Sequence, residues 1–282
     1  MSERILLAGC GDLGLRVARL LRARGNEVHA LRRHPPDGGS DGIRWLRGDL
    51  ADPASLRGLP AGIGCLVYLP APGSRDPDAY RSVFVDGLRN VLQALAGDPL
   101  QRVVFISSSA VYGEHHGAWV DENTPAAPLA GNGRILLEAE ALLASQPVPA
   151  VALRLAGLYG PGRMRLVERL RAGKAGAPRR PPHWANRIHI DDAAAAVAHL
   201  VGLPDPAPVY IGCDSTPLPL HELYAELARL AGAPAPAEAP APAHVGSKKL
   251  SNARLLASGF SLQWPDSRQG YAALLAAERA GR

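Results

Sequence analysis

A glycine-rich loop near the start of the chain has the spacing of a dinucleotide-binding site. Gly9, Gly11 and Gly14 form the pattern G-x-G-x-x-G directly after the apolar residues 5–8. Glycines at these positions let the backbone turn tightly and approach a pyrophosphate, whose charge then meets the N-terminus of the following helix. This chemistry requires an apolar strand before the loop and an amphipathic helix after it, and the sequence predicts both. The loop contains two further candidate cofactor contacts, Asp12 and Leu13.

Two arginines stand where NAD-binding domains usually carry a carboxylate. In such domains an acidic residue at the end of the second strand holds the ribose hydroxyl of NAD. Here that position, directly after residues 28–31, holds Arg32 and Arg33. Two guanidinium groups can bind a 2′-phosphate, which a carboxylate would repel. This pair favours NADP over NAD as the cofactor. The alternative is that both arginines are solvated surface groups.

Composition narrows the classes of partner. The 282 residues carry a formal charge of +5, and arginines gather between residues 163 and 187. They lack the aromatic–basic interleaving of nucleic-acid binders, so a small anionic molecule is the better expectation. The longest apolar runs end well before the ~20 residues that a membrane span needs, and no signal-peptide pattern opens the chain. We therefore expect a cytoplasmic protein with no membrane or nucleic-acid partner.

The cysteines do not indicate a metal site. Cys10, Cys65 and Cys213 are far apart, odd in number and without metal-ligand spacing. We expect three buried thiols, no disulfide and no bound metal.

Strands and helices alternate along the first part of the chain. Short apolar runs predict strands, and apolar residues at helical spacing predict helices between several of them. The expected strands are residues 5–8, 28–31, 43–46, 63–69, 102–107 and 148–155, and the expected helices are residues 13–21, 79–96 and 134–144. This alternation indicates an α/β protein with a Rossmann-type, doubly wound parallel sheet.

The second part of the chain is less regular. Residues 1–160 are expected to form an NAD(P)-binding Rossmann domain, and residues 161–282 a small C-terminal substrate lobe, with the chain crossing between the two. Residues 191–200 and 218–230 have helical patterns. Residues 231–243 are almost wholly Ala and Pro, which is typical of a stiff, extended connector.

Further motifs continue through nearly the whole length. They are G-D-L at 48–50, D-G-L-R-N-V-L at 86–92, S-S-S-A-V-Y-G at 107–113, R-L-A-G-L-Y-G-P-G at 154–162 and N-R-I-H-I-D-D at 186–192. Together with the glycine loop, they make the chain resemble an extended-type short-chain dehydrogenase/reductase, the group that contains nucleotide-sugar epimerases and dehydratases. The resemblance implies a nicotinamide cofactor and a small-molecule substrate.

The same resemblance assigns cofactor contacts. Asp49 and Leu50 should lie beside the adenine. Leu69, Pro70 and Ala71, at the end of the fourth strand, should line the cofactor groove.

Two serines should face the nicotinamide. They are Ser107 and Ser108, and Ser108 matches the catalytic Ser/Thr of the family. A hydroxyl there can donate a hydrogen bond to a substrate oxygen as charge shifts onto it. The alternative is a strand-end hydroxyl bonded to the backbone.

The proton-transfer pair of the family, Y-x-x-x-K, is missing. The lysine of that pair lowers the pKa of the tyrosine so that it can pass a proton near neutral pH. The matching segment here is G-N-G-R-I-L-L-E-A-E at 131–140, which places Asn132 at the tyrosine and Leu136 at the lysine. Neither side chain can do that chemistry. The chain is therefore an atypical member of the group that it resembles.

Three outcomes remain open for the proton. Another group in the loop after the serine strand can supply it, and the candidates are His115, His116, Tyr112, Asp121 and Glu122. Histidine is the best placed of these by intrinsic pKa. Water or the substrate can deliver it. Finally, the protein can bind the cofactor without turnover, as a regulatory or scaffold protein. The alternative for each histidine is a solvated loop residue.

The substrate side is less clearly marked. We expect contacts from Asn132, Arg154, Arg163 and Arg187 to a polar, sugar-like hydroxyl or carbonyl compound. Arg154 can equally form a structural ion pair, and the other arginines can form a solvated basic face. The helices 79–96 and 134–144 carry wide apolar surfaces, and the resemblance implies a homodimer that pairs through these two helices. The leading hypothesis is an NADP-dependent oxidoreductase or epimerase-like enzyme.

Overall fold

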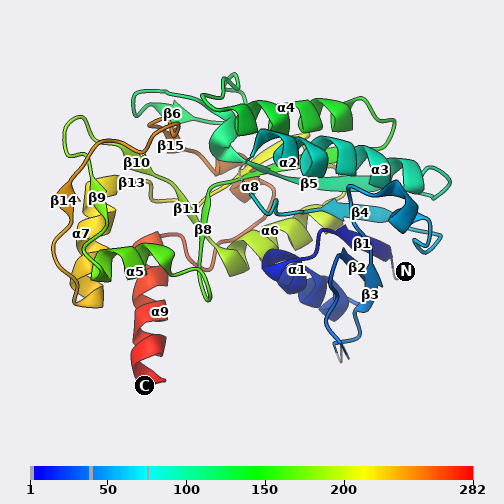
Figure 1. Ribbon diagram of the computed structural model, residues 1–282, viewed down its shortest axis with the longest axis horizontal. Coiled ribbons are helices and arrows are strands. Elements are labelled where there is room, and N and C mark those ends of the chain that lie inside the picture. Colours follow the sequence, from blue (N-terminus) through cyan, green and yellow to red (C-terminus); the bar gives the residue numbers. More distant parts are fainter. Residues whose placement is uncertain (1–2, 38–40, 75, 282) are drawn as a thin grey trace. The chain divides into compact units, whose positions relative to one another are not determined.

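The computed structural model describes residues 3–37, 41–74 and 76–281 (Figure 1). The chain forms two compact units that are interleaved in sequence. The first unit contains Met1–Ser108, Ala130–Arg154 and Ala194–Tyr210, and the second contains Ser109–Leu129, Leu155–Ala193 and Ile211–Arg282. The boundary expected at residue 160 falls inside one segment of the second unit.

A seven-stranded sheet forms the centre of the first unit. Its order is β12-β7-β5-β4-β1-β2-β3, and the β1–β2, β1–β4, β2–β3 and β4–β5 pairs are all parallel. The strands are β1 (Arg4–Ala8), β2 (Glu27–Arg32), β3 (Arg44–Arg47), β4 (Cys65–Tyr68), β5 (Arg102–Ser108), β7 (Ala150–Leu155) and β12 (Val209–Gly212). The predicted doubly wound α/β sheet is confirmed, whereas β12 was not expected.

The central strands are covered on both faces. Residues 5–8 of β1 and residues 65–68 of β4 are all fully buried. Burial on both faces explains why these strands are continuous apolar runs instead of alternating polar and apolar residues.

Helices cover the two faces of this sheet. They are α1 (Asp12–Ala23), α2 (Pro77–Arg81), the π-helical turn η2 (Ser82–Asp86), α3 (Gly87–Ala94), α4 (Gly131–Ala144) and α6 (Ile190–Gly202), with the 3-10 turn η1 (Pro53–Leu56). Figure 1 shows α1 and α6 on one face of the sheet and α2, α3 and α4 on the other. The helix expected over 79–96 is thus divided by a π-helical turn.

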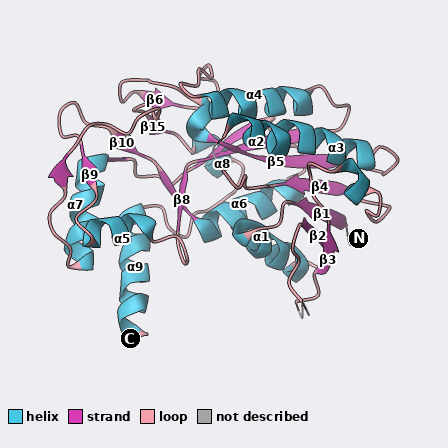
Figure 2. Cartoon of the chain, in the orientation of Figure 1, coloured by secondary structure: helices cyan, strands magenta, loops and turns pink. Residues whose placement is uncertain are grey.

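The second unit combines helices with short strand pairs (Figure 2). Its helices are η3 (Ser109–Val111), α5 (Arg165–Arg171), α7 (Leu220–Ala231), α8 (Ala253–Ala257) and α9 (Ser267–Ala280). Its strand pairs are β6 (Trp119–Val120) with β15 (Lys249–Leu250), β8 (Gly157–Tyr159) with β11 (Arg187–His189), β9 (Gly176–Ala177) with β14 (Ala237–Glu238), and β10 (Trp184–Ala185) with β13 (Leu218–Pro219). Helices α5 and α9 both pack on α7, and Val167, Leu227 and Leu275 belong to their shared apolar core.

Disulfides, metal sites and membrane-spanning helices are the three features that were not expected. Cys10, Cys65 and Cys213 are buried free thiols, and burial raises their pKa above the usual range of a thiol. Within residues 3–37, 41–74 and 76–281, no cluster of side chains is suited to hold a metal ion. No helix in the same ranges is long and apolar enough to cross a bilayer.

Candidate functional site

Two glycines of the N-terminal loop are required by the packing of the protein itself. Gly9 has a φ of +87°, and a Cβ there would lie 2.5 Å from the Cα of Pro70. At Gly14, a Cβ would lie 2.9 Å from the sulfur of Cys10 and 3.0 Å from the Cδ1 of Leu69. Any side chain at Gly9 is therefore excluded by both conformation and space, and Gly14 lets α1 pack closely behind the loop.

Gly11 is different, because a Cβ there would meet no atom within 4 Å. It lines a pocket and is the N-cap of α1, which has no side-chain cap. The N-terminus of α1 therefore carries the positive end of the helix dipole beside open space. This opening fits the close approach of a pyrophosphate, so the residues present suit a dinucleotide.

The pocket has a volume of about 490 Å³ and lies at the carboxyl ends of β1 to β4. In a doubly wound sheet this is where ligands bind, because β1 is the point at which the strand order reverses. The predicted cofactor residues that line it are Gly9, Gly11, Arg32, Arg33, Asp49, Leu50, Pro70 and Ala71.

Other residues of the pocket wall were not predicted from the sequence. They include Cys10, His34, Gly48, Ser74, Ser82 and Val83. His34 and Gly48 directly adjoin residues that were predicted, so the ends of β2 and β3 were a usable signal. Ser82 and Val83 belong to the π-helical turn, which no local pattern indicates.

Arg32 leaves the end of β2 over an aromatic ring. Its guanidinium carbon lies 5.9 Å from the centroid of the Trp45 ring. The two residues are neighbours because β2 and β3 pair in parallel, with Ala30 opposite Trp45. Arg32, Arg33 and His34 are exposed. This side of the pocket therefore presents two guanidinium groups and an imidazole to the solvent.

The turn after β3 is fixed by its own hydrogen bonds. The Asp49 carboxylate accepts the backbone N–H of Ala51 at 3.0 Å, and the Ser55 hydroxyl accepts the N–H of Asp49 at 2.9 Å. The Asn90 amide donates to the carbonyl of Leu50 at 2.9 Å. These bonds hold Asp49 and Leu50 at the pocket wall before any ligand arrives.

The π-helical turn also has a specific anchor. The Tyr68 hydroxyl donates to the Val83 carbonyl at 2.6 Å, and a Cβ on Gly87 would lie 2.7 Å from that hydroxyl. Val83 and Ser82 therefore line the pocket because a buried tyrosine holds the widened turn. π-helical turns recur at functional sites.

Other predicted cofactor residues lie outside the pocket lining. They are Asp12, Leu13, Gly14, Leu69 and Ser107. Asp12 forms an ion pair with Arg16 one turn along α1, at 3.2 Å. Gly14 and Leu69 pack together behind the loop.

Ser107 belongs to a buried polar network in the first unit. Its hydroxyl donates to Glu140 Oε1 at 2.5 Å, and Arg154 Nη2 donates to Glu140 Oε2 at 2.6 Å. The side chains of Arg154 and Glu140 are 9% and 10% exposed. Arg154, a predicted substrate contact, is thus held in the ion pair that was its structural alternative.

The start of α4 has no acid–base pair. Asn132 and Leu136 lie four residues apart on α4, the spacing that places two side chains on one helix face. Leu136 is 1% exposed and belongs to the apolar core. The position that the family resemblance assigns to a cation is therefore used for packing. Ser108 is the last residue of β5 and is half-buried.

In the second unit, the backbone around His115 and His116 is tied to a distant segment. The N–H groups of His115 and Gly117 both donate to the Ser247 carbonyl at 3.1 Å. Glu114 accepts the N–H of Ser247 at 2.9 Å and that of His116 at 2.6 Å. Burial alone would raise the pKa of the Glu114 carboxyl. The backbone N–H donors outweigh this effect and hold the pKa below its usual range.

The two histidines have different surroundings. The His116 side chain is 92% exposed, and its φ of +49° is unusual for a residue with a side chain. The Nε2 of His115 is buried without a hydrogen-bond partner. His115 is therefore the more enclosed of the two side chains.

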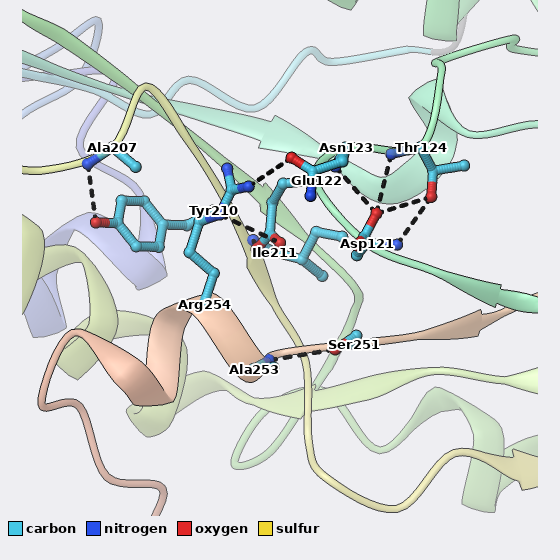
Figure 3. A network of polar contacts seen from close by, with 10 residues as sticks. All are labelled: Asp121, Glu122, Asn123, Thr124, Ala207, Tyr210, Ile211, Ser251, Ala253 and Arg254. Atoms are coloured by element: carbon cyan, nitrogen blue, oxygen red, sulfur yellow. Dashed lines mark hydrogen bonds and ion pairs between the residues drawn. The ribbon is translucent and has the colours of Figure 1, made fainter.

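The carboxylates of the same loop serve the fold (Figure 3). Glu122 accepts the N–H of Ile211 at 2.8 Å and lies 3.6 Å from the guanidinium of Arg254. Asp121 accepts the N–H groups of Asn123 and Thr124, each at 3.0 Å. The Thr124 hydroxyl is the largest cause that holds the pKa of Asp121 below its usual value.

The remaining predicted substrate arginines also lie in the second unit. The N–H of Arg163 donates to the Gly160 carbonyl at 2.9 Å. The Arg187 carbonyl accepts the N–H of Asp214 at 2.6 Å. The side-chain Nε of Arg187 is buried without a hydrogen-bond partner. Burial raises the pKa of Asp214 to about 7.

Comparison with known proteins identifies relatives over the whole chain. Residues 5–211 match the NAD dependent epimerase/dehydratase family. The chain is 30% identical over 255 residues to the 2-alkyl-3-oxoalkanoate reductase of Stenotrophomonas maltophilia, with 82% of this chain and 76% of that protein covered. A solved structure from Methylobacillus flagellatus, named for the same family, is 43% identical with a TM-score of 0.84, covering 99% of this chain and 100% of that one. The Thermus thermophilus UDP-glucose 4-epimerase in complex with NAD has a TM-score of 0.83 at 22% identity, with 99% of this chain and 100% of that chain covered. This likeness shows a common fold.

Proposed function

Because the chain belongs to the NAD-dependent epimerase/dehydratase family and is an NAD(P)-dependent oxidoreductase or epimerase, we propose that it prefers NADP and acts on a polar, sugar-like hydroxyl or carbonyl compound. The observation that carries this proposal is the groove of about 490 Å³ that joins the glycine loop to Arg32 and Arg33. Its open space at Gly11 suits a pyrophosphate, and its exposed cations suit a further phosphate.

The preference for NADP rests on charge at the end of β2. Arg32 and Arg33 line the groove, and His34 lies beside them. Trp45 supports the Arg32 guanidinium, since a cation over an indole ring is attracted to it. A guanidinium can form two parallel hydrogen bonds to one phosphate, whereas the NAD ribose offers only a neutral hydroxyl there.

We assign Ser108 as the hydrogen-bond donor to the substrate oxygen. The nicotinamide supplies hydride transfer when the cofactor is bound. The Ser108 hydroxyl, at the carboxyl end of β5, stabilises negative charge that develops on the oxygen. Glu140 and Arg154 hold the neighbouring Ser107 in place and so fix the end of this strand.

The proton requires a group other than the tyrosine of the family's pair, because Asn132 stands at that position. We assign it to His115, whose Nε2 is buried without a partner while its backbone is fixed by Ser247. Imidazole can give or accept a proton near neutral pH without the aid of a lysine. Asn132 is then free of an acid–base role and is assigned to substrate contact, as are Arg163 and Arg187.

A sugar-like substrate is supported by the fold of the relatives. The Thermus thermophilus neighbour is a UDP-glucose 4-epimerase, whereas the Stenotrophomonas relative is a reductase of 2-alkyl-3-oxoalkanoates. A substrate panel should therefore contain nucleotide sugars, free sugars and 3-oxo acids.

The cofactor assignment is tested by charge reversal. Arg32→Asp should weaken NADPH binding about tenfold to hundredfold, because a charge-assisted phosphate contact is lost and a repulsion is added. NADH binding should change less than threefold. Arg57→Asp, an exposed arginine outside the groove lining, is the matched control and should leave both affinities unchanged. Equal NADPH affinity in Arg32→Asp and wild type would refute the preference.

Turnover is tested separately, with NADPH absorbance followed across the panel. Ser108→Ala should lower kcat at least a hundredfold while NADPH binding stays within twofold. Tight NADPH binding with no turnover of any compound would instead support the second candidate, a cofactor-binding regulatory or scaffold protein. The loss of the Tyr and Lys positions to Asn132 and Leu136 is the observation that favours that candidate.

We also propose a homodimer formed through α3 and α4, in the cytoplasm. Apolar residues such as Leu92 and Leu137 on these helices are half-buried in the single chain. Small-angle scattering that gives the mass of two chains would support the dimer, and the mass of one chain would refute it.

A further inference from the structure

Two segments of the second unit lie back to back just before the β6–β15 strand pair. They are residues 113–117 and residues 246–248. A Cβ on Gly246 would overlap the Gly113 carbonyl and would lie 2.6 Å from the backbone N of Glu114. A glycine at position 246 is therefore required for the two backbones to approach this closely.

Each segment binds the backbone of the other through a charged side chain. The Glu114 carboxylate, in the first segment, accepts the N–H of Ser247 at 2.9 Å. The Lys248 ammonium, in the second segment, donates to the Gly113 carbonyl at 3.4 Å and to the Gly246 carbonyl at 3.2 Å. We refer to Glu114 and Lys248, with these contacts, as the charge clasp.

The charge clasp encloses the backbone of His115. The N–H groups of His115 and Gly117 both donate to the Ser247 carbonyl at 3.1 Å. Ser247 therefore offers its N–H to Glu114 and its carbonyl to the two amides that follow. Because these bonds fix the main chain of His115, they also fix the point from which its imidazole extends.

The ammonium of Lys248 is unusual for its burial. Lys248 is 5% exposed, and an ammonium leaves water only at a large cost in free energy. Among the residues that the structure describes, no carboxylate forms an ion pair with it. Burial lowers the pKa of Lys248, and the Glu114 carboxylate offsets part of this effect from a longer distance. A methionine would fill the same space without this cost, so the charge itself needs an explanation.

Two further titratable side chains lie near the charge clasp. His183 is 5% exposed. Burial lowers the pKa of His183, the Glu114 carboxylate raises it and the Lys248 ammonium lowers it, so the imidazole is neutral at pH 7. His116 lies 3.9 Å from Glu114, but its side chain is 92% exposed and solvent screens it. Glu114 and Lys248 are therefore the formal charges that the His115 backbone meets in these two segments.

We propose that Glu114 and Lys248 are positioning residues for His115, which hold its loop where a proton can be transferred. Each acts by fixing the backbone that carries the imidazole, because the contacts of both side chains are with main-chain atoms. A small displacement of a group that transfers a proton lowers the rate by up to about a hundredfold. The inference rests on the proposed function in that His115 is the proton donor.

The first experiment measures amide hydrogen exchange by NMR in the full chain. Glu114→Gln and Lys248→Met should each speed exchange at the His115 amide about tenfold, because a hydrogen bond to a charged group is lost. The Gly117 amide, which donates to the same carbonyl, should change by a similar factor.

Matched controls show whether the effect is local. Lys174→Met makes the same substitution at an exposed lysine of the second unit and should leave exchange at His115 unchanged. The Ser251 amide donates to the Val120 carbonyl at 2.9 Å in the adjoining strand pair and should keep its protection in every variant. NADPH binding should also be the same in every variant, which shows that the variants are folded.

The second experiment separates positioning from support of the fold. With NADPH and the panel compound that is reduced fastest, Lys248→Met should lower kcat about tenfold to hundredfold and leave the KM for NADPH within twofold. In a His115→Ala background the same substitution should change kcat less than about twofold, because the group that it positions is gone.

The outcomes distinguish this inference from the proposed function. Unchanged exchange at the His115 amide in both clasp variants overturns the inference, whether or not any compound is turned over. Equal acceleration at His115 and Ser251 overturns it as well, and so do losses of kcat from Lys248→Met and His115→Ala that multiply in the double variant. Full turnover in His115→Ala refutes the proton assignment of the proposed function, while faster exchange in the clasp variants still upholds the clasp as the support of this loop.

Discussion

The cofactor groove of the first unit and the polar clusters of the second unit are built in opposite ways. The groove is made largely of backbone, glycines and strand ends, and its cations, Arg32 and Arg33, face the solvent. The second unit contains ionisable groups that are buried away from any groove, and Asp214 and Lys248 are only 2% and 5% exposed. A site made of backbone can be predicted from the local sequence. A buried cluster of side chains depends on which distant segments of the chain pack together.

A charge placed at a buried position of α4 should have the largest effect on the free energy of unfolding. Leu136→Lys restores the residue type of the missing catalytic pair, but Leu136 is 1% exposed. The buried ammonium should destabilise the fold by about 5 kcal/mol at pH 7, because deep burial lowers a lysine pKa by several units. Denaturant unfolding measures this, with Leu136→Met as control at less than about 1.5 kcal/mol. An unchanged midpoint in Leu136→Lys would mean that the position still accommodates a cation.

A buried acid of the second unit should make stability depend on pH. Burial raises the pKa of Asp214 to about 7 from 3.8, so the folded state holds a proton that the unfolded state releases above pH 4. The contribution of this group to the free energy of unfolding is therefore fully present below pH 4. It falls by about 4 kcal/mol as the pH rises from 4 to 7. Asp214→Asn should remove this slope in unfolding curves measured from pH 4 to 7. The exposed Asp205→Asn should keep it, and an identical slope in both variants would refute the assignment.

The glycine loop should respond to a single methyl group. Gly9→Ala forces a side chain to a φ of +87° and to 2.5 Å from the Cα of Pro70, which should cost about 3 kcal/mol of stability. NADPH binding should fall at least a hundredfold, because the loop cannot keep its shape. Gly25→Ala has nearly the same φ, +85°, with no atom within 4 Å, and should cost only about 1 kcal/mol. Similar losses in the two variants would show that close packing on Pro70 is unimportant.

The smallest expected effect concerns the support of Arg32. Trp45→Leu removes the ring beneath the guanidinium and should weaken NADPH binding about threefold to tenfold, with NADH unchanged. Trp45→Phe should have an NADPH affinity between those of the wild type and Trp45→Leu. Fluorescence titration measures the affinity for both cofactors. An equal loss of NADH affinity would show that Trp45 supports the fold and has no role in phosphate recognition.

The same contrast explains what the sequence could predict. Six strands of the central sheet and the glycine loop were found because buried apolar runs and glycine spacing are local properties. The pocket residues Ser82 and Val83 were missed, since their positions depend on the hydroxyl of Tyr68. The contacts of Lys249 with the Trp119 and Trp184 rings were not predicted, because they join segments that lie about 130 and 65 residues apart in the chain.

The π-helical turn Ser82–Asp86 bears on how this groove tolerates insertions and deletions. A π-helical turn holds one residue more than an α-helical turn, so deleting one residue there would let α2 continue directly into α3. The deletion would leave a regular helix, yet every side chain before it would rotate by about 100° relative to α3. Ser82 and Val83 would leave the groove wall, and Tyr68 would lose its acceptor. Length variation at this one turn is thus a route by which a homologous sequence could change its cofactor site without altering any glycine of the loop.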